Sequence, residues 1–151
     1  MIKPSLVNHI LVLVDGTEAS FRAVDRAIDL ARSLGARLTA LAVIDRETLH
    51  HLLSAKILVD VELSEFEKEL ETSAERHLDV VRQRAQEQHL AVEEVLVTGN
   101  VGEIVPKEVH ARGVDLICLG GFHSSRISRD LLARQRQQVI DRAACPVLIV
   151  K

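Results

Sequence analysis

Short apolar runs alternate with amphipathic stretches along the chain. Runs such as HILVLV and PVLIV place apolar side chains on both faces of an extended backbone, which is typical of strands buried in a parallel sheet. Between these runs, apolar residues recur three and four positions apart, which predicts helices. We predict strands at residues 9–14, 37–44, 91–97, 114–119 and 146–150, and helices from the caps at 17–20 to Gly35, over about 61–89, from the turn at 99–100 to about 112, and over 128–143.

Three stretches carry local signals that modify this pattern. Asn100 followed by Glu103 resembles a capping box at the start of the third helix. Pro106 lies inside that helix and removes a hydrogen bond, so we expect a late start or a kink there. Residues 91–97 are more polar than the other strands, which indicates a position near the edge of the sheet. Residues 45–60 fit a loop, a short helix or both, and the sequence does not predict whether they are ordered.

The alternation of strands and helices predicts a single α/β domain over residues 1–151, with helices on both faces of a parallel sheet. Ligands of such sheets bind beyond the carboxyl ends of the strands, where the winding of the chain reverses. The strand ends that could meet there are Asp15 with Gly16, residues 43–45, residues 98–99, and Gly120 with Gly121.

Composition narrows the classes of function. The chain has 151 residues, of which 47% are hydrophobic and 27% charged, as expected for one folded domain. Aromatic residues make up only 2%, so a platform that stacks nucleic-acid bases is excluded. The net charge of −3 also argues against nucleic acid as a partner, including for the arginine-rich run 126–142.

The two cysteines indicate a reducing environment. Cys118 and Cys145 lie in or beside apolar runs, where a thiol serves as a small buried hydrophobic group rather than as half of a disulfide. The N-terminal stretch has no apolar run long enough to span a bilayer and does not resemble a signal peptide. We therefore expect a soluble, cytoplasmic protein without membrane insertion.

Four segments in order resemble the universal stress protein family over nearly the whole chain. They are ILVLVDGTEAS, LTALAVI, VTGNVGEIVPKEVHARGVDLICLGG and ACPVLIV. The resemblance implies a flavodoxin-like (Rossmann-like) three-layer sandwich, with a mainly parallel five-stranded sheet in the order 3-2-1-4-5. It also implies a homodimer formed through the last strand, 146–150. An apolar strand at a sheet edge needs a partner or a cover, which favours the same interface.

Members of this family that hold ATP carry a glycine, two residues, a glycine, nine residues, and then a glycine with a hydroxyl residue. Gly120 matches the first position, whereas His123, Ala133 and Arg134 occupy the others. Glycine lets backbone N–H groups approach a phosphate, so the side chains at these three positions are expected to crowd a triphosphate. The sequence does not predict whether His123 points into the cleft.

The adenosine side of the family's site is retained. Asp15 stands where the family's aspartate approaches the adenosine half of the ligand, and Val43 stands where the backbone meets adenine. From its position alone, Asp15 could bind a ribose hydroxyl or organise the turn before the first helix. The candidate cleft for a nucleotide or another anion comprises Asp15, Gly16, Val43, Gly99, Gly120, Gly121, Ser124, Ser125 and Arg126.

The Ser and Arg residues at 124–129 precede or begin the last helix, where N–H groups and the helix dipole favour an anion. They equally fit a solvated surface or a patch that docks a protein partner. Other constellations are weaker. There is no G-x-S-x-G elbow for a hydrolytic triad, and the E-x-x-H-H run at Glu47, His50 and His51 is a single copy that fits a solvated surface.

Two functions remain. The first is a small regulatory or binding protein of the stress response that lacks strong ATP binding and is not an enzyme, with weak ATP hydrolysis left open. The second is a sensor that binds ATP, AMP, a cyclic nucleotide or another anion in the cleft at the strand ends. No cofactor or metal is assigned with certainty, and a protein partner would be unknown.

Overall fold

A computed structural model of the chain describes residues 6–45, 60–121 and 126–151, with side chains throughout except at 60–63 and 126–132. The strands are β1 (His9–Leu13), β2 (Arg37–Asp45), β3 (Val92–Gly99), β4 (Leu116–Gly120) and β5 (Val147–Val150). The helices are α1 (Glu18–Leu34), α3 (Asp60–Glu87), α4 (Val101–Arg112) and α5 (Arg126–Arg142).

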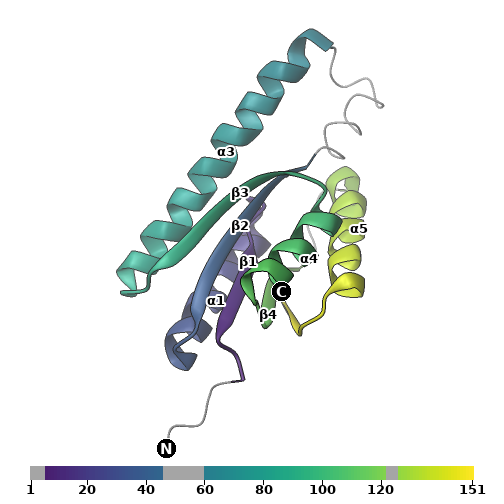
Figure 1. The fold of residues 1–151 in the computed structure, drawn as a ribbon. Helices are drawn as coiled ribbons and strands as arrows, with labels where there is room; N and C mark the ends of the chain where they lie inside the picture. The colour runs from purple at the N-terminus through teal and green to yellow at the C-terminus, as the bar shows by residue number, and fades with distance from the viewer. Residues whose placement is uncertain (1–5, 46–59, 122–125) are drawn as a thin grey trace, which may run out of the picture.

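The five strands form one parallel sheet in the order β3-β2-β1-β4-β5 (Figure 1). This confirms the predicted flavodoxin-like fold and the edge position of the third strand. The chain winds from β1 through β2 to β3 on one side, and then crosses to β4 and β5 on the other. The winding therefore reverses at β1, and the carboxyl ends of β1, β2 and β4 lie side by side.

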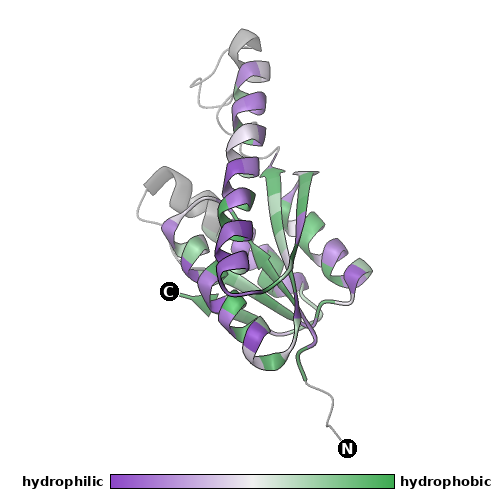
Figure 2. Cartoon of the chain, turned by 90° about the vertical axis from the view of Figure 1, so that its left-hand side faces the viewer, coloured by the Kyte–Doolittle hydropathy of each residue, from purple (hydrophilic) through white to green (hydrophobic). Residues whose placement is uncertain are grey.

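Two apolar clusters lie on opposite faces of the sheet. On one face, Ile10 and Val12 pack with residues of α1 and α3 such as Val24 and Val81. On the other, Leu11 packs with residues of α4 and α5. Alternate residues of one strand thus enter different clusters, as the pleat of a strand requires. Figure 2 shows the apolar strands between helices whose outward faces are polar.

The buried side chains of helix α3 among the described residues lie in its C-terminal half. Its buried residues Leu78, Val81 and Ala85 lie in that half, whereas most side chains from 64 to 69 are exposed. Figures 1 and 2 show the N-terminal half extending beyond the body of the domain. The middle of α3 therefore passes over the carboxyl ends of the strands.

The start of α4 differs from the prediction. The helix begins at Val101, so the expected late start is wrong, and the side chain of Asn100 makes no capping bond. Instead, Asp45 Oδ2 accepts a hydrogen bond of 2.9 Å from the Val101 N–H. A carboxylate interacts more favourably than an amide with the positive end of a helix dipole. Asp45 is almost fully buried, which strengthens that interaction.

The structure also shows how α4 accommodates Pro106. In a regular helix the Gly102 carbonyl would accept a hydrogen bond from the residue at 106, but proline has no N–H. Arg142 Nη1, from α5, donates to this carbonyl at 3.0 Å. The hydrogen bond that proline removes is thereby replaced by one between two helices.

We predict that Arg142→Met lowers the free energy of unfolding by about 1 to 3 kcal/mol, because it leaves the Gly102 carbonyl without a donor. In a Pro106→Ala background the restored N–H can donate to Gly102, so the same change should cost less. Urea unfolding of the four proteins measures this coupling. An equal cost in both backgrounds would contradict the replacement of one bond by the other.

A buried histidine joins β1 to its neighbours at the amino ends of the strands. His9 Nδ1 lies 3.0 Å from the Arg112 carbonyl, which only accepts, so Nδ1 carries the hydrogen. Nε2 lies 2.7 Å from Thr39 Oγ1, whose hydroxyl donates to it when the ring is neutral. Burial is the main cause that lowers the pKa of His9 below its ordinary value of 6.5, and the charge of Arg37 acts in the same direction.

Because the unfolded chain binds this proton at a higher pH than the folded chain does, acid should favour unfolding. We predict that the contribution of neutral His9 is fully present above pH 6.5 and is lost as the pH falls from 6.5 toward the lower folded pKa. The free energy of unfolding of the wild type should then fall more steeply on acidification than that of His9→Gln. Parallel profiles for the two proteins would refute a neutral His9 in the folded state.

Both cysteines are free thiols, and their placement agrees with the prediction. Cys118 is fully buried, and burial raises its pKa to about 12. Burial also raises the pKa of Cys145, which is half-buried. A thiol held protonated in this way is a poor nucleophile. None of the described helices combines the length and the apolar character that crossing a membrane requires.

Candidate functional site

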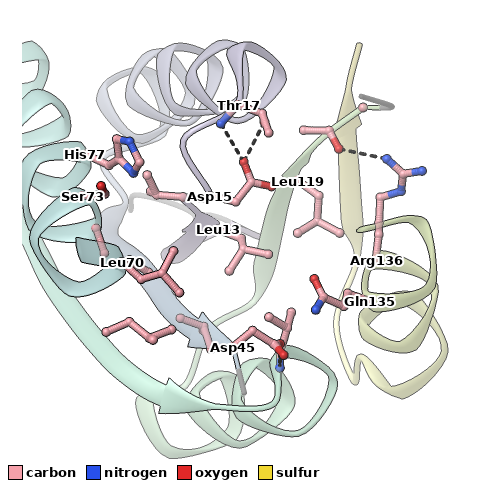
Figure 3. A pocket seen from close by; sticks show the side chains of 18 residues that line it. Leu13, Asp15, Thr17, Asp45, Leu70, Ser73, His77, Leu119, Gln135 and Arg136 are labelled. Carbon is pink, nitrogen blue, oxygen red and sulfur yellow. Dashed lines mark hydrogen bonds between the residues drawn. The ribbon is translucent and has the colours of Figure 1, made fainter. Parts of the chain in front are cut away.

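A cleft of about 240 Å³ lies beyond the carboxyl ends of β1, β2 and β4, between α3 and α5 (Figure 3). This is the edge at which parallel α/β sheets bind ligands. The lining comprises residues 13–15 and Thr17 at and after the end of β1, residues 42–45 of β2, Leu70, Ser73, Ala74 and His77 of α3, Val101 of α4, residues 119–121 at the end of β4, and Gln135 and Arg136 of α5.

Asp15 is an exposed carboxylate at the end of the central strand. Its Oδ1 accepts hydrogen bonds from the Thr17 N–H at 3.0 Å and from the Thr17 hydroxyl at 2.6 Å. Thr17 in turn caps α1 by accepting from the Ser20 N–H. Asp15 therefore organises the turn through one oxygen, and no hydrogen bond to Oδ2 occurs among the described residues.

Gly16, in the turn after β1, is in close contact with His77 but is not part of the cleft lining. Gly16 has a φ of +82°, and a Cβ at this position would lie 2.3 Å from His77 Cε1. The His77 ring also meets Phe21 edge-on, with centroids 5.8 Å apart. Two contacts thus hold the imidazole at the wall of the cleft. His77 was not predicted as a site residue, because the path of α3 over the strand ends has no local signal in the sequence.

Gly120 is required by packing rather than by a turn. A Cβ at this position would lie 2.6 Å from both the carbonyl carbon of Ala19 and the nitrogen of Ser20, which are backbone atoms that cannot move aside easily. Its carbonyl accepts a hydrogen bond of 3.2 Å from Arg136 Nη1. Gly121 also lines the cleft, and its N–H donates to the Val150 carbonyl.

Of the remaining predicted site residues, one lines the cleft, one does not, and the side chains of three lie outside the described residues. Val43 lines the cleft, whereas Gly99 is paired with Asp45 at the end of β3 and is not part of the lining. Ser124 and Ser125 lie outside the described residues, as does the side chain of Arg126. His123 and the segment with Glu47, His50 and His51 are likewise outside them.

The described residues do not show Ala133 or Arg134 crowding the cleft where a triphosphate would bind. Arg134 is exposed, and neither residue lines the cleft. The arginine that enters the lining is Arg136, which is half-buried and donates to Gly120. Within the described part of the chain, no group of three metal-ligating side chains is close enough to hold a metal ion.

Gln135 was missed by the sequence analysis. It is only 4% exposed and lines the cleft, and its buried Nε2 has no hydrogen-bond partner among the described residues. An unsatisfied buried donor costs about 1 to 3 kcal/mol. The available signal was helical spacing: Leu132, Gln135 and Val139 are three and four positions apart, which places a polar amide on the apolar stripe of the last helix.

Comparisons with known proteins agree with this fold. A family model described as the universal stress protein family matches residues 7–151. The universal stress protein YxiE of Bacillus subtilis is 28% identical over 149 residues, which cover 97% of this chain and all of that protein. A crystal structure of a universal stress protein family member from Burkholderia pseudomallei has a TM-score of 0.74 and 24% identity, and covers 97% of both chains.

Other similar structures are described as nucleotide complexes. One is a universal stress protein with cAMP, at a TM-score of 0.63 and 23% identity, covering 96% of this chain and 97% of the other. An Arabidopsis thaliana family member with AMP has a TM-score of 0.67 and 15% identity, covering 95% and 91%. An Archaeoglobus fulgidus universal stress protein with dAMP has a TM-score of 0.68 and 16% identity, covering 97% and 99%.

Proposed function

Because this chain belongs to the universal stress protein family, we propose that it acts in the stress response as a cytoplasmic regulatory protein that binds a ligand rather than catalysing a reaction. We propose that the ligand is a nucleoside or a mononucleotide, and that ATP binds weakly. The complexes of similar proteins with cAMP, AMP and dAMP support this class of ligand.

The proposal rests on how Asp15, at the mouth of the cleft, is hydrogen-bonded. Its Oδ1 is held by Thr17, so the carboxylate has a defined orientation before any ligand arrives. Its Oδ2 has no partner among the described residues and can accept a hydrogen bond from a ribose hydroxyl. A charged acceptor makes a stronger hydrogen bond than a neutral one does.

Two features favour a mononucleotide over ATP. The cleft, at about 240 Å³, lies below the range of roughly 300–1,000 Å³ that is usual for small-molecule sites. The Arg136 side chain also crosses to the Gly120 carbonyl, beside the turn where the family's ATP-holding members keep their glycines. A longer phosphate chain would have to displace this hydrogen bond.

Binding without catalysis follows from the other polar groups of the lining. Asp45 is engaged in capping α4, which leaves Asp15 as the carboxylate of the described lining that faces solvent. Hydrolysis of a nucleotide needs a positioned base and charge stabilisation for the transferred group. Asp15 is tied into a turn, the His77 ring packs against Gly16 and Phe21, and Arg136 donates to the Gly120 carbonyl. Each group is thus engaged within the protein, which favours binding over hydrolysis.

We predict that AMP raises the melting temperature more than ATP does at the same concentration. At about a hundred times its dissociation constant, AMP should stabilise the fold by ~2.7 kcal/mol. Asp15→Asn keeps an acceptor for Thr17 but loses the charge on Oδ2, so it should weaken AMP binding about tenfold or more. The control is Asp29→Asn, which changes an exposed aspartate of α1 outside the cleft. Equal stabilisation by ATP, or none by AMP, would overturn the proposal.

We also propose a homodimer formed through β5. This strand ends the sheet, and Ile149 is 36% exposed although it is a large apolar residue. The Pro146 carbonyl accepts a hydrogen bond from Ile117 of β4, and the Val150 carbonyl accepts one from Gly121, which follows β4. Backbone groups alternate in direction along a strand, so the N–H and C=O of Ile149 face the open edge. An open apolar edge favours pairing with a second copy.

We predict that Ile149→Pro weakens the dimer, because it removes an N–H from the open edge while the bonds from β4 to β5 remain. Ile149→Val keeps the N–H and the β-branched shape, so it should assemble as the wild type does. Analytical ultracentrifugation over a concentration series measures the dissociation constants. A proline variant as dimeric as the valine variant, or a monomeric wild type, would rule out this interface.

A further inference from the structure

Among the described residues, one buried side-chain donor of the cleft lining has no hydrogen-bond partner. The side chain of Gln135 is buried, and its Nε2 has no hydrogen-bond partner. Figure 3 shows the amide extending from α5 toward the strand ends, with Leu13 and Leu119 nearby. Native proteins pair almost all buried polar groups, so an unpaired donor in a cleft points to a partner from outside the chain.

The other buried side-chain atom without a partner serves as a comparison. Gln138 Oε1 lies against Gly102 of α4, at the contact between two helices, and Gln138 is not part of the cleft lining. The two glutamines carry the same amide group and lie on the same helix. Of the two, Gln135 lines a cleft that a ligand can enter, and Gln138 does not. The unpaired atom of Gln135 therefore fits a role in binding a ligand, whereas that of Gln138 fits imperfect packing between two helices.

The surroundings of Gln135 indicate which part of a ligand it meets. Val101 and Leu119 line the same cleft, and Gln135 itself carries no charge. The neighbouring cation, Arg136, donates to the Gly120 carbonyl. Burying a charged phosphate among apolar groups costs far more free energy than burying a neutral heterocyclic base. The base is therefore expected on the buried side with Gln135, and the phosphate toward the exposed mouth.

We propose that Gln135 determines the specificity of the cleft by binding the nucleobase of the ligand. This rests on the proposed function. The Nε2–H donates to an acceptor atom on the edge of the base, and the amide oxygen can accept from a neighbouring amino group of the same base. A buried amide built to meet such a pair discriminates strongly against a ligand that leaves it unpaired.

The test compares Gln135→Met with Gln138→Met. Methionine keeps the length of glutamine and removes its polar atoms, so each variant deletes one buried unpaired atom from α5. Isothermal titration of AMP should show binding about tenfold weaker or more in Gln135→Met, and unchanged binding in Gln138→Met. Ribose 5-phosphate, which lacks a base, should bind Gln135→Met as it binds the wild type, however weakly.

The alternative outcomes are distinct. If AMP binds the wild type and Gln135→Met equally well, Gln135 does not bind the base, although the proposed function stands. If AMP and ribose 5-phosphate both bind the wild type and weaken equally in Gln135→Met, the residue acts on the whole site, and base recognition is overturned. If AMP does not bind the wild type, both proposals fail. Thermal unfolding without ligand measures whether both variants are folded, and each change removes a buried polar atom that has no partner among the described residues.

Discussion

The close approach of β4 to the first turn of α1 is the contact on which the cleft depends. At Gly120 there is no room for a side chain, because a Cβ would lie 2.6 Å from backbone atoms of Ala19 and Ser20. The same turn of α1 begins with Thr17, which holds Asp15. One glycine thus sets the distance between the end of β4 and the Asp15 turn, and overpacking at this point would separate the two walls of the cleft.

Most buried polar groups around this framework are paired in ways that also join distant segments. Asp45 links the end of β2 to the start of α4, Arg142 links α5 to the Gly102 carbonyl, and His9 links β1 to Thr39. Each bond satisfies a group whose burial would otherwise be unfavourable. Against this background the unpaired amide of Gln135 is an exception, and it lies where a ligand can reach it.

The sequence predicted the features that depend on local pattern. Apolar runs alternating with helical periodicity identify a parallel sheet, and the resemblance of four segments supplies its strand order, which the structure confirms. The features that it missed depend on partners far away along the chain. Asp45 caps a helix 56 residues later, and Arg142 compensates for Pro106 from another helix. Neither interaction leaves a signal near Asn100 or Pro106.

The candidate site was predicted in part for the same reason. Asp15, Val43, Gly120 and Gly121 follow from strand ends and do line the cleft, whereas Gly16 is not part of the lining. The last helix was interpreted by its charge, which drew attention to Arg126, Arg129 and Arg134. Its helical spacing places Gln135 on the inward face, and the structure adds Arg136 to the lining. His77 could not be predicted, because only the packing of α3 brings it to the strand ends.

The most direct measurement is a crystal structure of the protein grown with AMP. The account predicts a ligand between α3 and α5, with a ribose hydroxyl bonded to Asp15 Oδ2 and an acceptor of the base within hydrogen-bond distance of Gln135 Nε2. AMP bound elsewhere, or a base directed away from Gln135 with its phosphate buried against Leu119, would contradict it.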